Sequence, residues 1–131
     1  MPQSKSKKVR RELKKVKHTV KFLSHGPENK IVRAILASSS DALIKAISNA
    51  ALNVRQNPTL KIQPANRNLF SSYSRTFDIL ANRAIPIESK RKYLKHQKGG
   101  AFGLIPILLS TALSLGSGFV SRLFNRNSEN E

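Results

Sequence analysis

The Lys and Arg residues of this chain are the ones whose type and spacing indicate a chemical role. Lys and Arg number 24 against 7 Asp and Glu, which gives a net charge of +17 in 131 residues. Most of these cations gather in two clusters. The first comprises Lys5, Lys7, Lys8, Arg10, Arg11, Lys14, Lys15, Lys17 and Lys21, and the second comprises Lys90, Arg91, Lys92, Lys95 and Lys98. Neutralising a phosphate releases counterions, so both clusters are predicted to bind nucleic acid without reading its sequence.

The sequence contains no comparable pattern of residues that would indicate catalysis or metal binding. Glu12, Glu28, Asp41, Asp78 and Glu88 are scattered and form no pair at a spacing suited to acid–base work. The three His residues have no second His or carboxylate at ligand spacing, and Cys is absent. We therefore predict that the protein is not an enzyme and holds no metal or cofactor. An anionic membrane surface is the alternative polyanion, because basic amphipathic helices also adsorb to lipid.

The first cluster lies on a predicted amphipathic helix over residues 7–24. Its apolar residues recur at spacings of 4, 3, 4 and 3, which places them on one stripe opposite a wide cationic face. These residues are Val9, Leu13, Val16, Val20 and Leu23. His25-Gly26-Pro27 should end the helix. Residues 1–8 are polar and are expected to be disordered.

Between the two clusters the sequence predicts a helical core. Short helices are expected over residues 28–37 and 41–54, with Ser38 to Asp41 supplying the N-cap of the second. Asp41 and Lys45 lie four residues apart and are expected to pair. After an extended connector over residues 59–64, a helix over residues 66–83 carries an aromatic stripe that should pack on residues 41–54. Core packing is preferred to base stacking for this stripe.

A last basic helix is predicted over residues 87–97, and no segment alternates with period 2 for long enough to form a strand. The predicted fold is all-α, a small three- to four-helix bundle with a basic N-terminal helix and a C-terminal apolar helix or tail. We divide it into a basic amphipathic arm (1–26), a helical core (27–85), a basic helix with a Gly-Gly hinge (86–100), and an uncharged apolar segment with a polar tail (101–131).

The uncharged run from Ala101 to Ser121 comprises 21 residues without a formal charge. A membrane span needs about 20 predominantly apolar residues. Pro106, several Gly and several hydroxyl side chains weaken this run as a span. Two interpretations stay open: the region 101–124 contacts or crosses a membrane, or it forms an apolar tail that buries against other copies of itself.

Two segments resemble a known family. They are IVRAILASSSDALIKAISNAALNV (Ile31–Val54) and KRKYLKHQKGGAFGLIPILLS (Lys90–Ser110). Both are similar to the small basic proteins of Maverick/Polinton elements and adintoviruses, which are compared with the adenovirus minor core protein mu, or X. The resemblance covers about the last 100 residues, and its motif is a basic stretch, Gln-x-Gly-Gly, and an apolar tail. The cations here are mixed Lys and Arg, whereas mu is dense in Arg.

The resemblance implies a virion protein that condenses packaged DNA in the virion core and host nucleus. It also implies maturation by a virus-encoded cysteine protease of the adenovirus type. Gln97, Lys98, Gly99 and Gly100 match the form that such proteases recognise, with the cut before Ala101. Two Gly residues lie extended in a narrow protease tunnel that side chains would block. A flexible joint before the apolar run is the alternative interpretation of the Gly-Gly pair.

The leading hypothesis is a non-enzymatic, sequence-nonspecific protein that binds and condenses double-stranded DNA. The alternative is a membrane-active or tail-anchored protein that acts at a host membrane, motivated by residues 101–124 beside cations that attract anionic headgroups. A basic RNA-associated protein, such as a ribosomal component, is the third interpretation. It explains the charge but not the apolar run.

Overall fold

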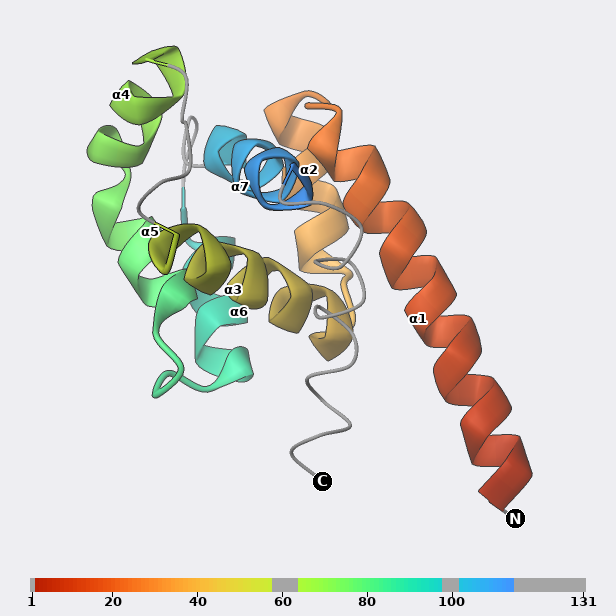
Figure 1. The fold of residues 1–131 in the computed structure, drawn as a ribbon. Coiled ribbons are helices and arrows are strands. Elements are labelled where there is room, and N and C mark those ends of the chain that lie inside the picture. Colours follow the sequence, from red (N-terminus) through yellow and green to blue (C-terminus); the bar gives the residue numbers. More distant parts are fainter. Residues whose placement is uncertain (1, 58–63, 98–101, 115–131) are drawn as a thin grey trace.

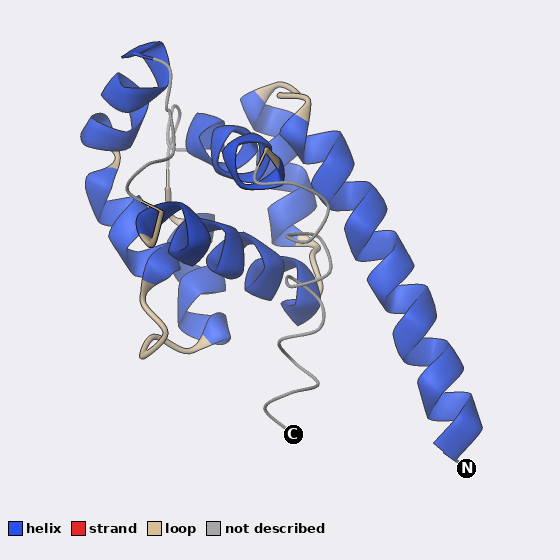
Figure 2. Ribbon diagram, in the orientation of Figure 1, coloured by secondary structure: helices blue, strands red, loops and turns tan. Residues whose placement is uncertain are grey.

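The computed structural model describes residues 2–57, 64–97 and 102–114. These residues form seven α-helices and no strand (Figures 1 and 2). The helices are α1 (Pro2–Ser24), α2 (Asn29–Ala37), α3 (Asp41–Arg55), α4 (Pro64–Ser72), α5 (Ser74–Ala81), α6 (Ile87–Lys95) and α7 (Leu104–Leu113). The all-α class is confirmed. The helices are more numerous and shorter than a three- to four-helix bundle requires.

Helix α1 begins earlier than the sequence predicts. It starts at Pro2, so residues 2–8 are helical and the expected disorder is wrong for them. Proline suits the first turn of a helix, and the Lys, Arg and Gln that follow it are good helix formers. The predicted stop is confirmed: Gly26 adopts a φ of +75°, and its N–H donates to the carbonyl of Leu23 at 3.0 Å.

The turn between α2 and α3 contains the predicted N-cap. The backbone N–H of Leu43 donates to Ser40 Oγ at 3.4 Å, so Ser40 caps α3. The neighbouring Asp41 does not pair with Lys45 as expected. It accepts a hydrogen bond from Arg91 of α6 at 2.5 Å instead. A partner fixed by tertiary packing has replaced the local one.

The predicted helix over residues 66–83 is two helices, α4 and α5. The chain bends at Tyr73, whose φ and ψ are −116° and 35°. The rings of Phe70 and Phe77, one on each side of the bend, meet edge to face with centroids 5.3 Å apart. Helix α5 packs on α3, and its Leu80 is fully buried. The aromatic stripe lies against the core, as its spacing predicts.

Helix α7 lies in the middle of the fold, between α3 and α1 (Figure 1). Its residues Leu104, Ile105, Leu108, Leu109 and Ala112 are completely buried. Residues 104–113 of the uncharged run therefore pack in the core of their own chain and do not form a tail that buries against other copies. Among the described residues, no helix combines the length and hydropathy needed to cross a membrane. Residues 115–121 of the run lie outside the described residues.

Candidate nucleic-acid interface

Helix α1 separates its apolar and cationic residues onto opposite faces. Its 23 residues make a rod about 35 Å long at about 1.5 Å per residue. Val16, Val20 and Leu23 are buried, and the helix packs on α7 and α3. Lys14, Lys17 and Lys21 recur at spacings of 3 and 4 on the opposite side, and all three are exposed. Arg11 and Lys15 are exposed as well.

The N-terminal half of α1 extends away from the other helices (Figure 1). Four predicted phosphate-binding residues, Lys5, Lys7, Lys8 and Arg10, lie on this half. The structure describes their backbone but not their side chains. The first turn contains no acidic residue of its own that would oppose an anion at the positive end of the helix macrodipole.

The second cluster is divided by the fold. Lys92 and Lys95 are exposed on α6, and their contact with phosphate stays a prediction. Lys90 and Arg91, next to them in sequence, turn toward the protein instead. Lys98 lies outside the described residues. The cluster that looks uniform in sequence therefore presents two exposed ammonium groups among the residues that the structure describes.

Lys90 is buried, with 2% of its surface exposed. Its Nζ donates to the carbonyl of Leu80 at 3.0 Å and to Ser48 Oγ, and Ser48 Oγ itself donates to the same carbonyl at 2.6 Å. No carboxylate pairs with Lys90 within the described parts of the chain. Burial lowers the pKa of the Lys90 ammonium. The prediction that Lys90 contacts phosphate is therefore wrong, because its buried ammonium cannot reach an anion outside the protein.

Arg91 links α6 to the start of α3. It donates to Asp41 at 2.5 Å, to Glu88 at 2.7 Å, and to the carbonyl of Ser39 at 3.2 Å. The hydrogen bond with Asp41 raises the pKa of Arg91 further above its already high value. Only 15% of its side chain is exposed. With two carboxylates already on its guanidinium, Arg91 contributes little net charge to the surface.

The fold adds a cation that the sequence clusters do not contain. Arg33 of α2 joins Arg91 and Lys95 around a cavity of about 250 Å³ between α2 and α6. Arg33 and Lys95 are both exposed. Because 62 positions separate them in sequence, their proximity depends on the packing of α2 against α6. No local pattern signals it.

Of the predicted processing motif, Gln97 is half-buried at the end of α6, and Lys98, Gly99, Gly100 and Ala101 lie outside the described residues. The cut before Ala101 stays a prediction. Membrane contact through 101–124 also stays a prediction, and for residues 104–113 it would require α7 to leave its contacts with α1 and α3. Across residues 2–57, 64–97 and 102–114, no group of three or more His, Cys, Asp or Glu could hold a metal ion.

Comparison with protein families, with curated proteins and with solved structures found no match to this chain.

Proposed function

We propose that this chain is a non-enzymatic, sequence-nonspecific nucleic-acid-binding protein that neutralises the phosphates of double-stranded DNA. Its resemblance to the small basic proteins of Maverick/Polinton elements supports a condensing role in the core of a virus or virus-like transposon. The proposal extends to maturation at Gly100 by a virus-encoded cysteine protease. The interface rests on α1, with Lys92, Lys95 and Arg33 as a second basic surface.

The cationic face of α1 is the observation that carries this proposal. Arg11, Lys14, Lys17 and Lys21 follow one side of a helix whose opposite side is buried. A line of ammonium and guanidinium groups along a rigid rod suits a regularly spaced phosphate backbone. Such contacts fix the position of a duplex without identifying its bases.

Two features support condensation of duplexes rather than binding of single strands. The basic residues occur on two surfaces, one on α1 and the other on α2 and α6, an arrangement that draws two duplexes together. Single-strand binding uses exposed aromatic platforms, each base contributing about 1–3 kcal/mol by stacking. The chain has no Trp, and Phe22 is the only aromatic among the large hydrophobic side chains that are clearly exposed on the described surface.

The experiment is a titration of two duplexes of equal length and unrelated sequence at salt concentrations from about 50 to 200 mM. Equal affinities for the two duplexes are expected, together with a logarithmic affinity that falls linearly with the logarithm of salt by about 0.9 per phosphate contacted. Light scattering on long DNA should show compaction under the same conditions. An affinity that is insensitive to salt, or that differs strongly between the duplexes, would overturn the proposal.

A further inference from the structure

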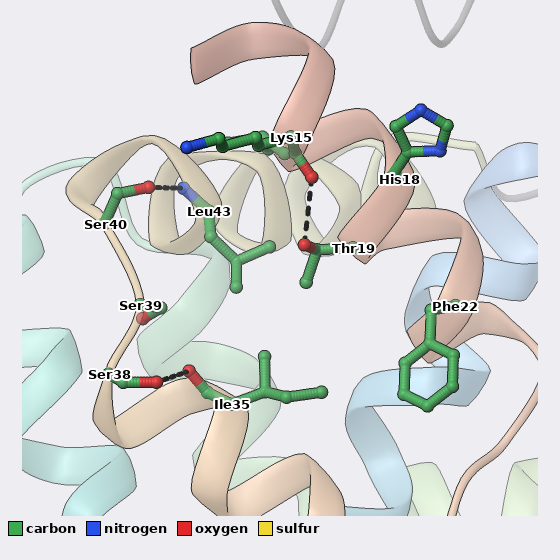
Figure 3. Close-up of a pocket in the computed structure, with 10 residues that line it drawn as sticks. Lys15, His18, Thr19, Phe22, Ile35, Ser38, Ser39, Ser40 and Leu43 are labelled. Atoms are coloured by element: carbon green, nitrogen blue, oxygen red, sulfur yellow. Dashed lines mark hydrogen bonds between the residues drawn. The ribbon is translucent and has the colours of Figure 1, made fainter. Parts of the chain in front are cut away.

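A second cavity, larger than that beside Arg33, lies between α1 and the turn from α2 to α3. Its volume is about 520 Å³, within the range of about 300–1,000 Å³ typical of ligand sites. Val16 and Leu43, both buried, and the half-buried Ile35 form its apolar floor. Figure 3 shows Ile35, Leu43 and Thr19 facing the space between these elements, with Phe22 at one end. We call this cavity the α1–α3 groove.

Phe22 is the unusual member of the groove. It is 48% exposed, although it lies on a highly charged helix beside the buried Leu23. Lys15 precedes it by two helical turns, so both side chains lie along the same edge of α1. A half-exposed aromatic ring at the end of an apolar depression is the type of residue that anchors a partner chain. No described residue covers this ring.

Among the described residues that line the groove, the rim carries the positive charge of Lys15 and no carboxylate. Lys15 and His18 line it on α1, and Ser38, Ser39 and Ser40 line it opposite. The hydroxyl of Ser39 donates to the carbonyl of Leu36 at 2.8 Å, and Ser40 Oγ caps α3, so both oxygens already have roles within the fold. The Lys15 ammonium is therefore the strongest donor that the rim offers to a bound molecule. The rim therefore favours a bound molecule with acidic groups, and the floor favours one that also carries apolar side chains.

The properties of the occupant follow from this combination. A second copy of the chain is unsuitable, because each copy carries +17 and four of its seven acids are already in ion pairs. Duplex nucleic acid would satisfy Lys15 but leave the apolar floor and Phe22 unused. We propose that the α1–α3 groove binds an acidic amphipathic segment of a partner protein, whose apolar side chains enter the groove while its carboxylates meet Lys15 and the neighbouring cations of α1.

The test uses three labelled peptides of roughly 14 residues, a length that forms about four helical turns. The first carries Leu and Phe at positions i and i+4 among Glu residues. The second has the same Glu residues with Ser in place of Leu and Phe, and the third keeps Leu and Phe but has Gln in place of Glu. Fluorescence anisotropy with the full chain at about 0.15 M salt should show the first peptide binding at least about tenfold more tightly than either control.

Variants of the chain locate the binding. Phe22→Ser should weaken binding of the first peptide by about tenfold, and Ser38→Trp, at an exposed position on the opposite wall, should block the groove to a similar extent. Lys15→Gln should weaken binding severalfold. Arg75→Gln removes one positive charge from an exposed site on α5, outside both basic surfaces, and should leave binding unchanged. Circular dichroism of each variant checks that the helical content is retained.

Equal binding of the first and second peptides would overturn the inference, since it would show adsorption of any polyanion. Normal binding by both well-folded Phe22→Ser and Ser38→Trp would overturn it as well. Because the assay contains no nucleic acid, its failure is distinguishable from a failure of the proposed function, which is measured on duplexes alone.

Discussion

Helices α1 and α6 are both rich in Lys and Arg, but the fold uses their charges differently. The described side chains of Arg11, Lys14 and Lys21 on α1 are all exposed. On α6, Lys90 is buried beneath the surface and Arg91 is held by two carboxylates. The difference arises from geometry: α1 contacts the core along one side only, whereas the shorter α6 packs on both α2 and α3. The number of cations in a segment therefore does not measure the charge that it presents.

This comparison also separates two roles of a basic side chain. On α1 the ammonium groups of Lys14 and Lys21 are exposed to water, where a polyanion can reach them. On α6 the same residue types fasten helices together, Lys90 bridging to α3 and the end of α5, and Arg91 bridging to the start of α3. Substitutions of the exposed cations of α1 should therefore alter nucleic-acid affinity, whereas substitutions of Lys90 and Arg91 should act on folding stability.

The largest effect is expected from a substitution in the core that holds α1 and α6 in place. Leu108 of α7 is completely buried, so Leu108→Ala should lower the free energy of unfolding by about 2–5 kcal/mol. Denaturant titration followed by circular dichroism measures the change. Ser110→Ala, at an exposed position of the same helix, is the control and should change stability by less than about 0.5 kcal/mol. A loss below about 1 kcal/mol for Leu108→Ala would contradict the central position of α7.

The next effect concerns binding and compares the helices directly. Lys14→Gln with Lys21→Gln on α1, and Lys92→Gln with Lys95→Gln on α6, each remove two exposed charges. The α1 pair should weaken duplex affinity by about tenfold at 0.15 M salt and flatten the salt dependence by about two phosphate contacts. The α6 pair should weaken affinity by about threefold or less, because its neighbouring cations are turned inward. Equal losses of duplex affinity in the two double variants would show that affinity depends only on total charge. That result would contradict the difference between α1 and α6.

A smaller effect is expected on stability from Arg91. Arg91→Ala should lower the free energy of unfolding by about 1 kcal/mol, because its partners Asp41 and Glu88 are largely exposed and screened by water. A double-mutant cycle with Asp41→Ala isolates the direct coupling between the two side chains. The salt dependence of duplex binding should not change. A salt dependence of duplex affinity reduced by about one phosphate contact would instead place Arg91 in the phosphate-binding interface.

The smallest effect, and the sharpest test of burial, is expected at Lys90. Lys90→Met keeps the apolar stem and removes a charge that has no carboxylate partner in the described parts of the chain, so stability at neutral pH should be unchanged or higher by up to about 1 kcal/mol. Ser48 Oγ continues to donate to the Leu80 carbonyl, so neither group loses its partner. Duplex affinity should be unaffected, whereas a loss comparable to that of the α1 pair would place Lys90 at the surface.

The pH dependence of the same variant carries a definite sign. Burial lowers the pKa of Lys90 in the folded chain, while in the unfolded chain it stays near the ordinary value of about 10.4. Between these two values the unfolded chain binds more protons, so stability rises with pH across the interval. Unfolding titrations from neutral pH to about pH 10 should show this rise in the wild type relative to Lys90→Met. Lys95→Met, at an exposed position, should track the wild type.

Much of the fold was predictable because it depends on local signals. The 3-and-4 spacing of Val16, Val20 and Leu23 anticipated the buried side of α1, and Ser40 caps α3 as its place before Asp41 suggested. Capping, turn formation and amphipathic periodicity are set by neighbours within a few residues, so they can be read without tertiary structure.

The errors at Lys90 and at Tyr73 have different causes. Lys90 shares the spacing of Ile87 and Leu94, three residues after one and four before the other, so the helical period marked it as facing inward. The charge of Lys90 predicts exposure and its position in the helix predicts burial, and the structure follows the position. The bend at Tyr73, by contrast, has no comparable signal in the aromatic stripe, because it depends on how α4 and α5 fit against the other helices.

By itself, the sequence determined that this protein is helical, strongly basic, and equipped with one amphipathic helix whose cations face away from its apolar stripe. Those properties follow from composition and periodicity, which belong to the chain before it folds. The tertiary structure decided which cations reach water and where the apolar run at residues 104–113 resides. Both outcomes depend on the surfaces that other helices offer: α1 and α3 bury α7, and Ser48 with the Leu80 carbonyl holds the Lys90 ammonium, which points inward.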